Sequence, residues 1–327
     1  MLTALLPISC DGRVLLYGII LIDDSACAPK IGLALGSGAS RGWSHIGVLK
    51  ALIAAGIEPD VVCGTSVGAM VGGSYLAGNL DKLENWVLGS SRSDVLRFFS
   101  FRLANSAFVD IERFNWFLHN FVAADEVLIE QLGKPYAAVC TDLDSGREVL
   151  LRLGSVADSV RASMAMPGLF PAQRNNQRWL VDGGLVNPLP VTACRMLGAD
   201  IVIGVNLNAD ILSRRHAKTP GTATEATDTT FGNLKNQVAE HSKLHFENDD
   251  ETRKTPGFFS MISNTISIFQ DQIIRARLEA DPADILIEPK VGDIGMFEFQ
   301  RAADAIKEGE ACVRSAMVDI LRHTGTR

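Results

Sequence analysis

The sequence has 327 residues, of which 47% are hydrophobic and 21% are charged. This composition is typical of a folded protein with a substantial core, and the length suits one large α/β domain or two small ones. The net charge of -7 gives no general attraction for the phosphates of nucleic acids or for anionic lipid surfaces. We therefore expect no nucleic-acid partner, and a lipid substrate would have to bind through apolar contact.

The six cysteines form no CxxC pair, and several of them lie within apolar segments. This pattern favours buried free thiols in a reducing compartment over disulfides or zinc ligands. We expect a cytoplasmic protein, with a peripheral position at a membrane surface as the alternative.

Residues 1–29 read as an N-terminal extension. The apolar run from Val14 to Ile22 is too short to span a bilayer as a helix. Arg13 is the only basic residue before this run, and Asp11 lies close by, so we do not expect a cleaved signal peptide. The extension is interpreted as dispensable and disordered, or as the product of a start codon assigned too far upstream.

A regular pattern of strands and helices begins at Lys30. Residues 31–35 predict a short buried strand that runs into a glycine-rich loop at 36–42, and residues 43–55 carry apolar side chains at helical spacing. A second apolar run at 61–63 leads through a glycine-flanked serine into another helical stretch that ends near Ala77. The order of these elements predicts a parallel βαβ unit with a right-handed crossover.

The rest of the chain continues the same α/β pattern with one interruption. Further strands are predicted at 136–140, 148–151, 179–181, 201–207 and 285–287, and a long amphipathic helix at 299–321. Residues 210–256 are rich in Thr, Asn, Lys, Asp and Glu and poor in apolar residues. We interpret this stretch as a polar mobile insertion within one domain.

The first candidate for chemistry is a serine between two glycines, in the order Gly64-Thr65-Ser66-Val67-Gly68. The motif lies where an apolar strand meets a helix, the context in which a tight turn projects a nucleophilic hydroxyl. The start of the following helix also favours developing negative charge. The motif alone leaves open the alternative of a plain glycine-lined turn in an α/β sheet.

The glycine loop at 36–42 superficially resembles a dinucleotide-binding motif. That motif requires glycine where Arg41 stands, and the loop lacks the lysine of a nucleotide-binding P-loop. Backbone N–H groups at the start of a helix, unobstructed by side chains, suit the stabilisation of an oxyanion. The alternative is a structural loop that packs a helix against a strand, with Arg41 fixing its shape.

A serine nucleophile needs a base, and no histidine has a convincing setting. The histidines after Ser66 are His119, His216, His241, His245 and His323. None of them follows a predicted strand, and His45 on the first helix fits a structural histidine better than a base. The sequence therefore argues against a Ser-His-Asp triad.

A carboxylate is the alternative base. Asp182 follows a short apolar strand and is followed by Gly183 and Gly184. Burial can raise the pKa of such a carboxylate enough for it to accept the serine proton. Taken alone, Asp-Gly-Gly is also the sequence of an ordinary turn.

Together these motifs resemble the patatin-like phospholipase family, especially its short bacterial members related to RssA. The four blocks of the family occur in order, at Gly36–Gly42, Gly64–Gly68, the ASMAMPGLFP stretch of 162–171, and Asp182–Gly184. The runs IGLALGSGASRGWSHIGVLKAL, LVDGGLVNPLP and ADIVIGVNL extend the resemblance from about Lys30 to Leu207.

The resemblance implies a three-layer α/β/α fold with a mainly parallel central sheet, forming an acyl hydrolase domain over residues 30–322. It implies a Ser-Asp dyad that cleaves lipid esters through an acyl-enzyme and needs neither a metal nor another cofactor. Carried over by position, Ser66 is the nucleophile and Asp182 the general base.

The supporting residues carry over in the same way. Backbone N–H groups around Gly38 and Ala39 form the oxyanion hole, within a loop that also includes Gly36, Gly42 and a supporting Arg41. Gly64, Gly68, Gly183 and Gly184 support the two catalytic turns, and Pro167 belongs to the block that shapes the acyl pocket.

Two other readings remain open at this stage. A regulatory or scaffold protein could keep the fold while doing little chemistry, although both Ser66 and Asp182 are present. A membrane-associated protein could make transient surface contact through the apolar residues of 258–274, whose helical spacing also fits a helix packed on the core. Headgroup, acyl chain and oligomeric state are not indicated by the sequence.

Overall fold

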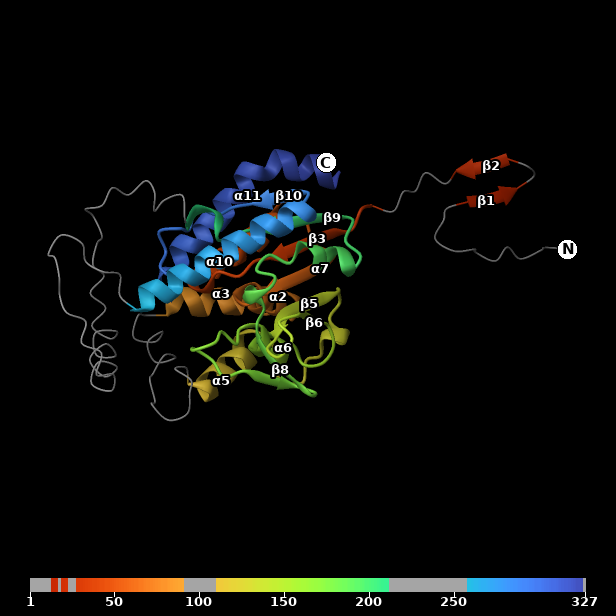
Figure 1. Cartoon of the computed structure of the whole chain (residues 1–327). Coiled ribbons are helices and arrows are strands. Elements are labelled where there is room, and N and C mark those ends of the chain that lie inside the picture. The colour runs from red at the N-terminus through yellow and green to blue at the C-terminus, as the bar shows by residue number, and fades with distance from the viewer. Residues whose placement is uncertain (1–12, 17–18, 23–27, 91–109, 212–257, 326–327) are drawn as a thin grey trace, which may run out of the picture.

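The computed structural model describes residues 13–16, 19–22, 28–90, 110–211 and 258–325. Its centre is an eight-stranded sheet with the strand order β10-β9-β3-β4-β5-β8-β7, in which β6 also pairs with β5 (Figure 1). Helices cover both faces of this sheet, as expected from the alternation of apolar strands with helical segments.

The parallel part of the sheet contains the predicted βαβ unit. Strand β3 (Ile31–Leu35) leads into helix α1 (Ser44–Ala54), and β4 (Val61–Thr65) leads into α2 (Val67–Leu76). Strands β3 and β4 pair in parallel, and β5 (Tyr136–Asp142) adds to β4 in the same direction. All three strands are buried along their length, which explains their nearly continuous apolar sequences.

The sheet is extended on both sides of this unit. On one side β9 (Ile201–Val205) and β10 (Ile285–Ile287) continue the parallel order. On the other side β6 (Glu148–Leu151), β8 (Arg178–Asp182) and β7 (Gln173–Asn175) are antiparallel to their neighbours. The sheet is therefore mainly parallel with an antiparallel edge, which confirms the predicted fold class.

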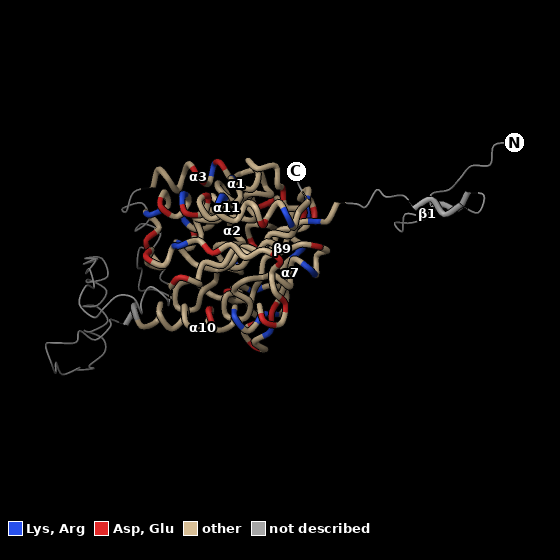
Figure 2. The backbone as a smooth tube through the Cα atoms, turned by 90° about the horizontal axis from the view of Figure 1, so that it is seen from above, with Lys and Arg blue, Asp and Glu red and all other residues tan. Residues whose placement is uncertain are grey.

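The two faces of the sheet carry different helices. One face is covered by α1, α2, α3 (Leu80–Gly89), α5 (Ile111–Phe121), α6 (Val156–Ser163) and α11 (Ala302–Thr324), and the other by α7 (Val191–Met196) and α10 (Phe258–Ala280). Viewed from above, β9 lies between α1, α3 and α11 on one side and α10 on the other (Figure 2). Leu33 and Leu35 pack toward the first face and Ala34 toward the second, as strand alternation requires.

The structure describes only parts of the N-terminal extension (1–29) and of the polar insertion (210–256). Within the N-terminal extension, β1 (Arg13–Leu16) and β2 (Ile19–Ile22) pair as an antiparallel hairpin, which the sequence analysis did not predict. Most of the proposed insertion at 210–256 lies outside the described residues. Among the helices that are described, none combines the length and the apolar character needed to cross a membrane.

Candidate active site

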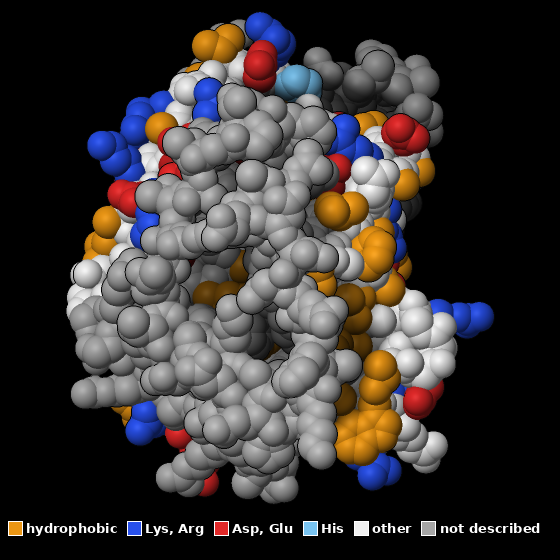
Figure 3. Space-filling view, turned by 60° about the vertical axis from the view of Figure 1, so that its left-hand side comes forward, with side chains coloured by type: hydrophobic (Ala, Val, Ile, Leu, Met, Phe, Trp, Pro, Cys, Tyr) orange, Lys and Arg blue, Asp and Glu red, His pale blue; other side chains and the backbone are white. Residues whose placement is uncertain are grey.

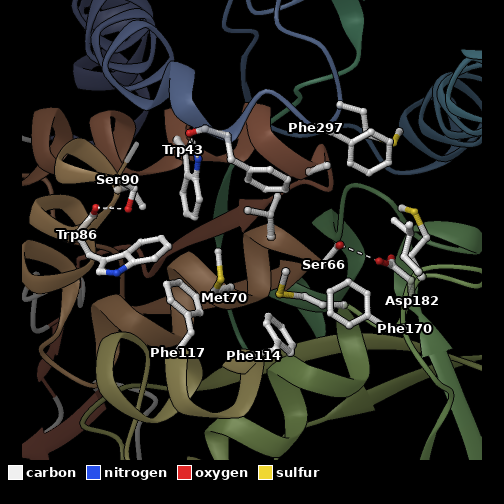
Figure 4. A pocket seen from close by; sticks show the side chains of 18 residues that line it. Trp43, Ser66, Met70, Trp86, Ser90, Phe114, Phe117, Phe170, Asp182 and Phe297 are labelled. Atoms are coloured by element: carbon white, nitrogen blue, oxygen red, sulfur yellow. Dashed lines mark hydrogen bonds between the residues drawn. The ribbon is translucent and has the colours of Figure 1, made fainter. Parts of the chain in front are cut away.

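Ser66 and Asp182 meet at one edge of the sheet, although 116 positions separate them in the chain. The Ser66 hydroxyl donates to Oδ2 of Asp182 over 2.7 Å (Figure 4). Strand β5 brings them together, because β4 ends beside it at Thr65, while Asp182 on β8 pairs with Cys140 on its other edge. Both side chains are almost fully buried, with exposed fractions of 7% and 2%.

Ser66 occupies a sharp turn between β4 and α2. Its backbone angles are φ 57° and ψ −122°, a region that residues other than glycine seldom adopt and that costs about 1–3 kcal/mol. The turn also brings α2 close to β3, so that a Cβ atom at Gly68 would lie 2.2 Å from the Leu35 carbonyl oxygen. The close approach of these two backbones therefore requires glycine at position 68. The other glycine of the motif, Gly64, is the last residue but one of β4.

Asp182 is held by hydrogen bonds on its side chain and its backbone. The Gly184 N–H donates to Oδ1 over 2.7 Å, and the Thr141 hydroxyl donates to the Asp182 carbonyl oxygen over 2.8 Å. Burial raises the pKa of the Asp182 carboxyl from 3.8 to about 6, while the hydrogen bonds from Ser66 and Gly184 act in the opposite direction. Gly183 begins the short turn that aims the Gly184 N–H at the carboxylate. Asp182 is therefore an anion at neutral pH but a stronger base than an exposed aspartate.

The described histidines lie away from this hydrogen bond. His45 is fully buried, and its Nε2 lies 2.8 Å from the Gly36 carbonyl oxygen, so this nitrogen is the donor. Burial lowers the pKa of His45 to about 4 against this hydrogen bond, so the ring is neutral and stabilises the glycine loop. His119 pairs with Asp125, and His323 lies at the end of α11. His216, His241 and His245 lie outside the described residues.

The glycine loop between β3 and α1 offers two free backbone donors. The N–H groups of Gly36 and Ser37 donate to Val205 and Pro188, whereas those of Gly38 and Ala39 have no acceptor among the described residues. Ala39 lines the same pocket as Ser66 and Asp182, and its φ of 50° is again unusual for a residue other than glycine. The glycine loop therefore borders the pocket and carries two backbone donors that have no partner among the described residues.

Two residues of the loop fix its position. A Cβ atom at Gly42 would lie 2.2 Å from Cγ1 of Val67, so glycine lets the loop pack directly against the first residue of α2. The Arg41 side chain is buried, and its Nε donates to the Ile294 carbonyl oxygen over 2.9 Å. Arg41 thus ties the loop to the segment before α11.

An apolar pocket extends from the Ser66 hydroxyl on the side of the sheet that is covered by α2, α3 and α5 (Figure 4). It contains about 880 Å³ of space, part of which is open to solvent. Its walls come from α2, α3, α5, the 164–170 segment and the 296–299 segment, and include Met70, Trp86, Phe114, Phe117, Phe170 and Phe297. Pro167 itself does not line the pocket, although its neighbours Met164, Met166 and Phe170 do.

Helix α10, which covers the other face of the sheet together with α7, buries polar side chains and exposes apolar ones. It buries Ser267, Gln270 and Asp271, while Met261 and Phe269 are 48% and 62% exposed. In Figure 3, hydrophobic side chains of the described residues gather toward the right-hand side of the view. The predicted helix at 258–274 thus packs on the fold while several of its apolar side chains remain exposed.

No cluster of three or more His, Cys, Asp or Glu side chains suited to a metal ion occurs in the part of the chain that the structure describes. The Ser66 hydroxyl contacts the Asp182 carboxylate and opens into a pocket lined by Ala39 of the glycine loop and mainly by apolar side chains. This set can activate a hydroxyl, stabilise a developing oxyanion and bind an apolar chain.

Known proteins resemble this chain in sequence over most of its length. A family model described as patatin-like phospholipase matches residues 33–195, a range that includes the glycine loop, Ser66 and Asp182. An uncharacterized NTE family protein of Mycobacterium tuberculosis is 30% identical over 332 residues, covering 89% of this chain and 92% of the relative. Lysophospholipase nte1 of Neurospora crassa is 30% identical over 188 residues, covering 56% of this chain and 12% of that protein. The chain belongs to the patatin-like phospholipase family.

Proposed function

We propose that the chain is a serine acyl hydrolase that cleaves carboxylic esters of lipids through a Ser66–Asp182 dyad. The observation that carries this proposal is the 2.7 Å hydrogen bond from the Ser66 hydroxyl to Asp182, at the end of an apolar pocket. The family name and the name of the Neurospora lysophospholipase support lipid esters as the substrate class.

In the first half of the reaction, Ser66 Oγ attacks the ester carbonyl carbon while its proton passes to Oδ2 of Asp182. The carbonyl oxygen becomes an oxyanion, which the N–H groups of Gly38 and Ala39 stabilise. The intermediate then breaks the bond to the alcohol oxygen, and Asp182 returns the proton to this leaving group. The products are a free alcohol and an acyl-enzyme on Ser66.

In the second half, water takes the place of the alcohol. Asp182 accepts a proton from the water as its oxygen attacks the acyl carbon, and the collapse of the second intermediate returns the proton to Ser66. A carboxylate with a pKa of about 6 is suited to both transfers, because it is ionised at neutral pH and still holds a proton more firmly than an exposed aspartate. The same group therefore serves as base and acid without an imidazole.

The pocket supports an apolar acyl chain as the group that is transferred. Its walls are mainly aromatic and methionine side chains, and the serine and aspartate lie together at one end. An acyl chain can lie against Met70, Phe114 and Phe117 while its carbonyl group lies at Ser66. Burial of this chain supplies the binding energy that a protein of net charge -7 does not obtain from anionic lipid.

The test is hydrolysis of p-nitrophenyl esters and of a phospholipid and lysophospholipid panel by the wild type, Ser66→Ala and Asp182→Asn. Both variants are expected to lose about a thousandfold or more in kcat, as for losses of a nucleophile or its base elsewhere. A fluorophosphonate probe should label the wild type at Ser66, and chelators should not change the activity. Turnover retained by Ser66→Ala would refute the mechanism.

Matched controls are available within the same site. Ser90 also lines the pocket, but its hydroxyl donates to the Trp86 carbonyl oxygen, so Ser90→Ala should keep its activity. Asp142 is a second buried aspartate at the end of β5, and Asp142→Asn should likewise remain active. Failure of the wild type both to react with the probe and to hydrolyse any ester would favour the alternative, a regulatory or membrane-associated protein that keeps the fold.

A further inference from the structure

The end of α6 and the two residues after it are hydrogen-bonded to the backbones of both Ser66 and Asp182. Ser163, the last residue of α6, accepts the N–H of Ser66 at its hydroxyl oxygen over 2.9 Å. Two residues later, the Ala165 carbonyl oxygen accepts the N–H of Asp182 over 3.0 Å. A segment of three residues is thus hydrogen-bonded to each partner of the 2.7 Å contact between the Ser66 hydroxyl and the Asp182 carboxylate.

The hydrogen bonds of the Ser163 hydroxyl leave no ambiguity about its orientation. It donates to the Val139 carbonyl oxygen over 2.6 Å, and a carbonyl oxygen can only accept. Its lone pair therefore faces Ser66, whose backbone N–H can only donate. Ser163 is fully buried, so water does not compete for either bond.

This hydroxyl lies where β4 leaves the sheet. Thr65 is the last residue of β4 in register with β5, opposite Val139, and Ser66 turns away with its unusual backbone angles. The Ser66 N–H consequently has no strand partner, and the Ser163 hydroxyl bridges it to the carbonyl group of Val139. Strand β5 also pairs with Asp182 through the next residue, Cys140.

From this arrangement we infer that Ser163 is a positioning residue, which holds the Ser66 turn at the distance from Asp182 that proton transfer requires. The inference rests on the proposed function, because it assigns Ser163 to the same reaction. The hydrogen bonds of the Ser163 hydroxyl go to backbone groups and not to either side chain of the dyad. Its effect therefore passes through the backbones of Ser66 and Val139.

The physical consequence of losing this hydroxyl is specific. In Ser163→Ala the N–H of Ser66 and the carbonyl group of Val139 both lose a buried partner. The strained turn can then relax, and displacement of a reacting atom by about 1 Å can lower a rate by about a hundredfold. Ground-state binding of the acyl chain should change little, because its walls are formed by other residues.

The experiment measures kcat and KM for a p-nitrophenyl ester, the labelling rate with a fluorophosphonate, and the melting temperature. Ser163→Ala is expected to lower kcat and the labelling rate by about ten- to a hundredfold, with KM changed by less than about threefold. The acidic limb of the kcat/KM profile should move to higher pH, because the hydrogen bond from Ser66, which lowers the pKa of Asp182, is weakened. Ser163→Cys nearly preserves the shape but donates and accepts weakly, so it should lower kcat while keeping most of the stability.

Ser74→Ala is the matched control. Ser74 is a fully buried serine on α2 whose hydroxyl donates to the Phe121 carbonyl oxygen over 2.9 Å, so its loss should lower stability without lowering kcat. A kcat within about twofold of wild type in both Ser163 variants would overturn the inference, as would losses that follow only the folded fraction. If Ser163→Ala does not fold, the same criterion applies to Ser163→Cys. An inactive and unlabelled wild type would instead overturn the proposed function, and this inference with it.

Discussion

Replacement of Asp182 by asparagine is expected to abolish hydrolysis and to make the fold more stable at pH 8. The reason is the burial of the carboxylate, which is 2% exposed and whose pKa burial raises to about 6. The amide can keep both contacts of the carboxylate, since its oxygen can accept the Gly184 N–H and its nitrogen can donate to the Ser66 hydroxyl. The variant therefore removes a buried charge and keeps a partner for the Gly184 N–H, while the Ser66 hydroxyl loses the acceptor for its proton.

The size and sign of the effect follow from the pKa. A rise from 3.8 in the unfolded chain to about 6 in the fold corresponds to about 3 kcal/mol at 25 °C. Because the folded value is the higher one, the fold keeps its full stability below pH 3.8 and loses this amount as the pH rises through about 6. Asp182→Asn should therefore unfold with a free energy about 3 kcal/mol higher than wild type at pH 8, and with about half that gain at pH 5.

Urea denaturation of the wild type and the variant at pH 8 and pH 5 measures this difference. Asp142→Asn is the control of opposite sign: burial raises the pKa of Asp142, but hydrogen bonds, first those from the Ser145 and Asp144 N–H groups, hold it below its usual value. Asp142→Asn should therefore reduce stability at pH 8. An Asp182→Asn protein no more stable than wild type at pH 8, or equally stabilised at both pH values, would refute the reasoning.

Three further predictions follow from the site and the surface. The kcat/KM of the wild type should rise with pH through about 6, reaching at pH 5 only about a tenth of its plateau, since Asp182 must be ionised; a limb near pH 4 would contradict this. Gly42→Ala should lower kcat at least tenfold, because its Cβ would meet Val67 and displace the glycine loop; unchanged kcat would argue against the oxyanion role. In liposome flotation, Phe269→Ser should weaken membrane binding and Val318→Ser, equally exposed on α11, should not; equal binding by both would exclude α10 as a docking face.

The part of the fold that sequence reasoning reached is the part encoded locally. Within a few dozen residues the chain forms β3, the glycine loop, α1, β4 and the turn at Ser66. Apolar periodicity or glycine spacing predicts each of these elements. The meeting of Ser66 with Asp182 was a different kind of prediction: the lack of a suitable histidine pointed to a carboxylate as the base, and the resemblance to a family linked the two distant motifs.

The walls of the apolar pocket that come from α3 and α5 could not be predicted from the sequence. Trp86 on α3 and Phe114 on α5 line it, yet at helical spacing such residues are indistinguishable from core side chains. The same limit applies to α10, whose polar residues Ser267 and Gln270 are buried while Phe269 is exposed. Helical periodicity identifies two faces of a helix, but the buried face of α10 carries Ser267, Gln270 and Asp271 as well as the apolar Ile274.

The costs within the site bear on the choice between an enzyme and an inactive scaffold. The backbone conformation of Ser66 costs about 1–3 kcal/mol, and the buried charge of Asp182 about 3 kcal/mol at neutral pH. Neither residue is needed to fill the core: glycine would relieve the turn, and asparagine would keep the contacts of the carboxylate. A protein that used this fold only as a scaffold would gain stability from either replacement. The presence of both residues, with Ser163 satisfying the strained turn, is what a hydrolytic site requires and what a scaffold does not explain.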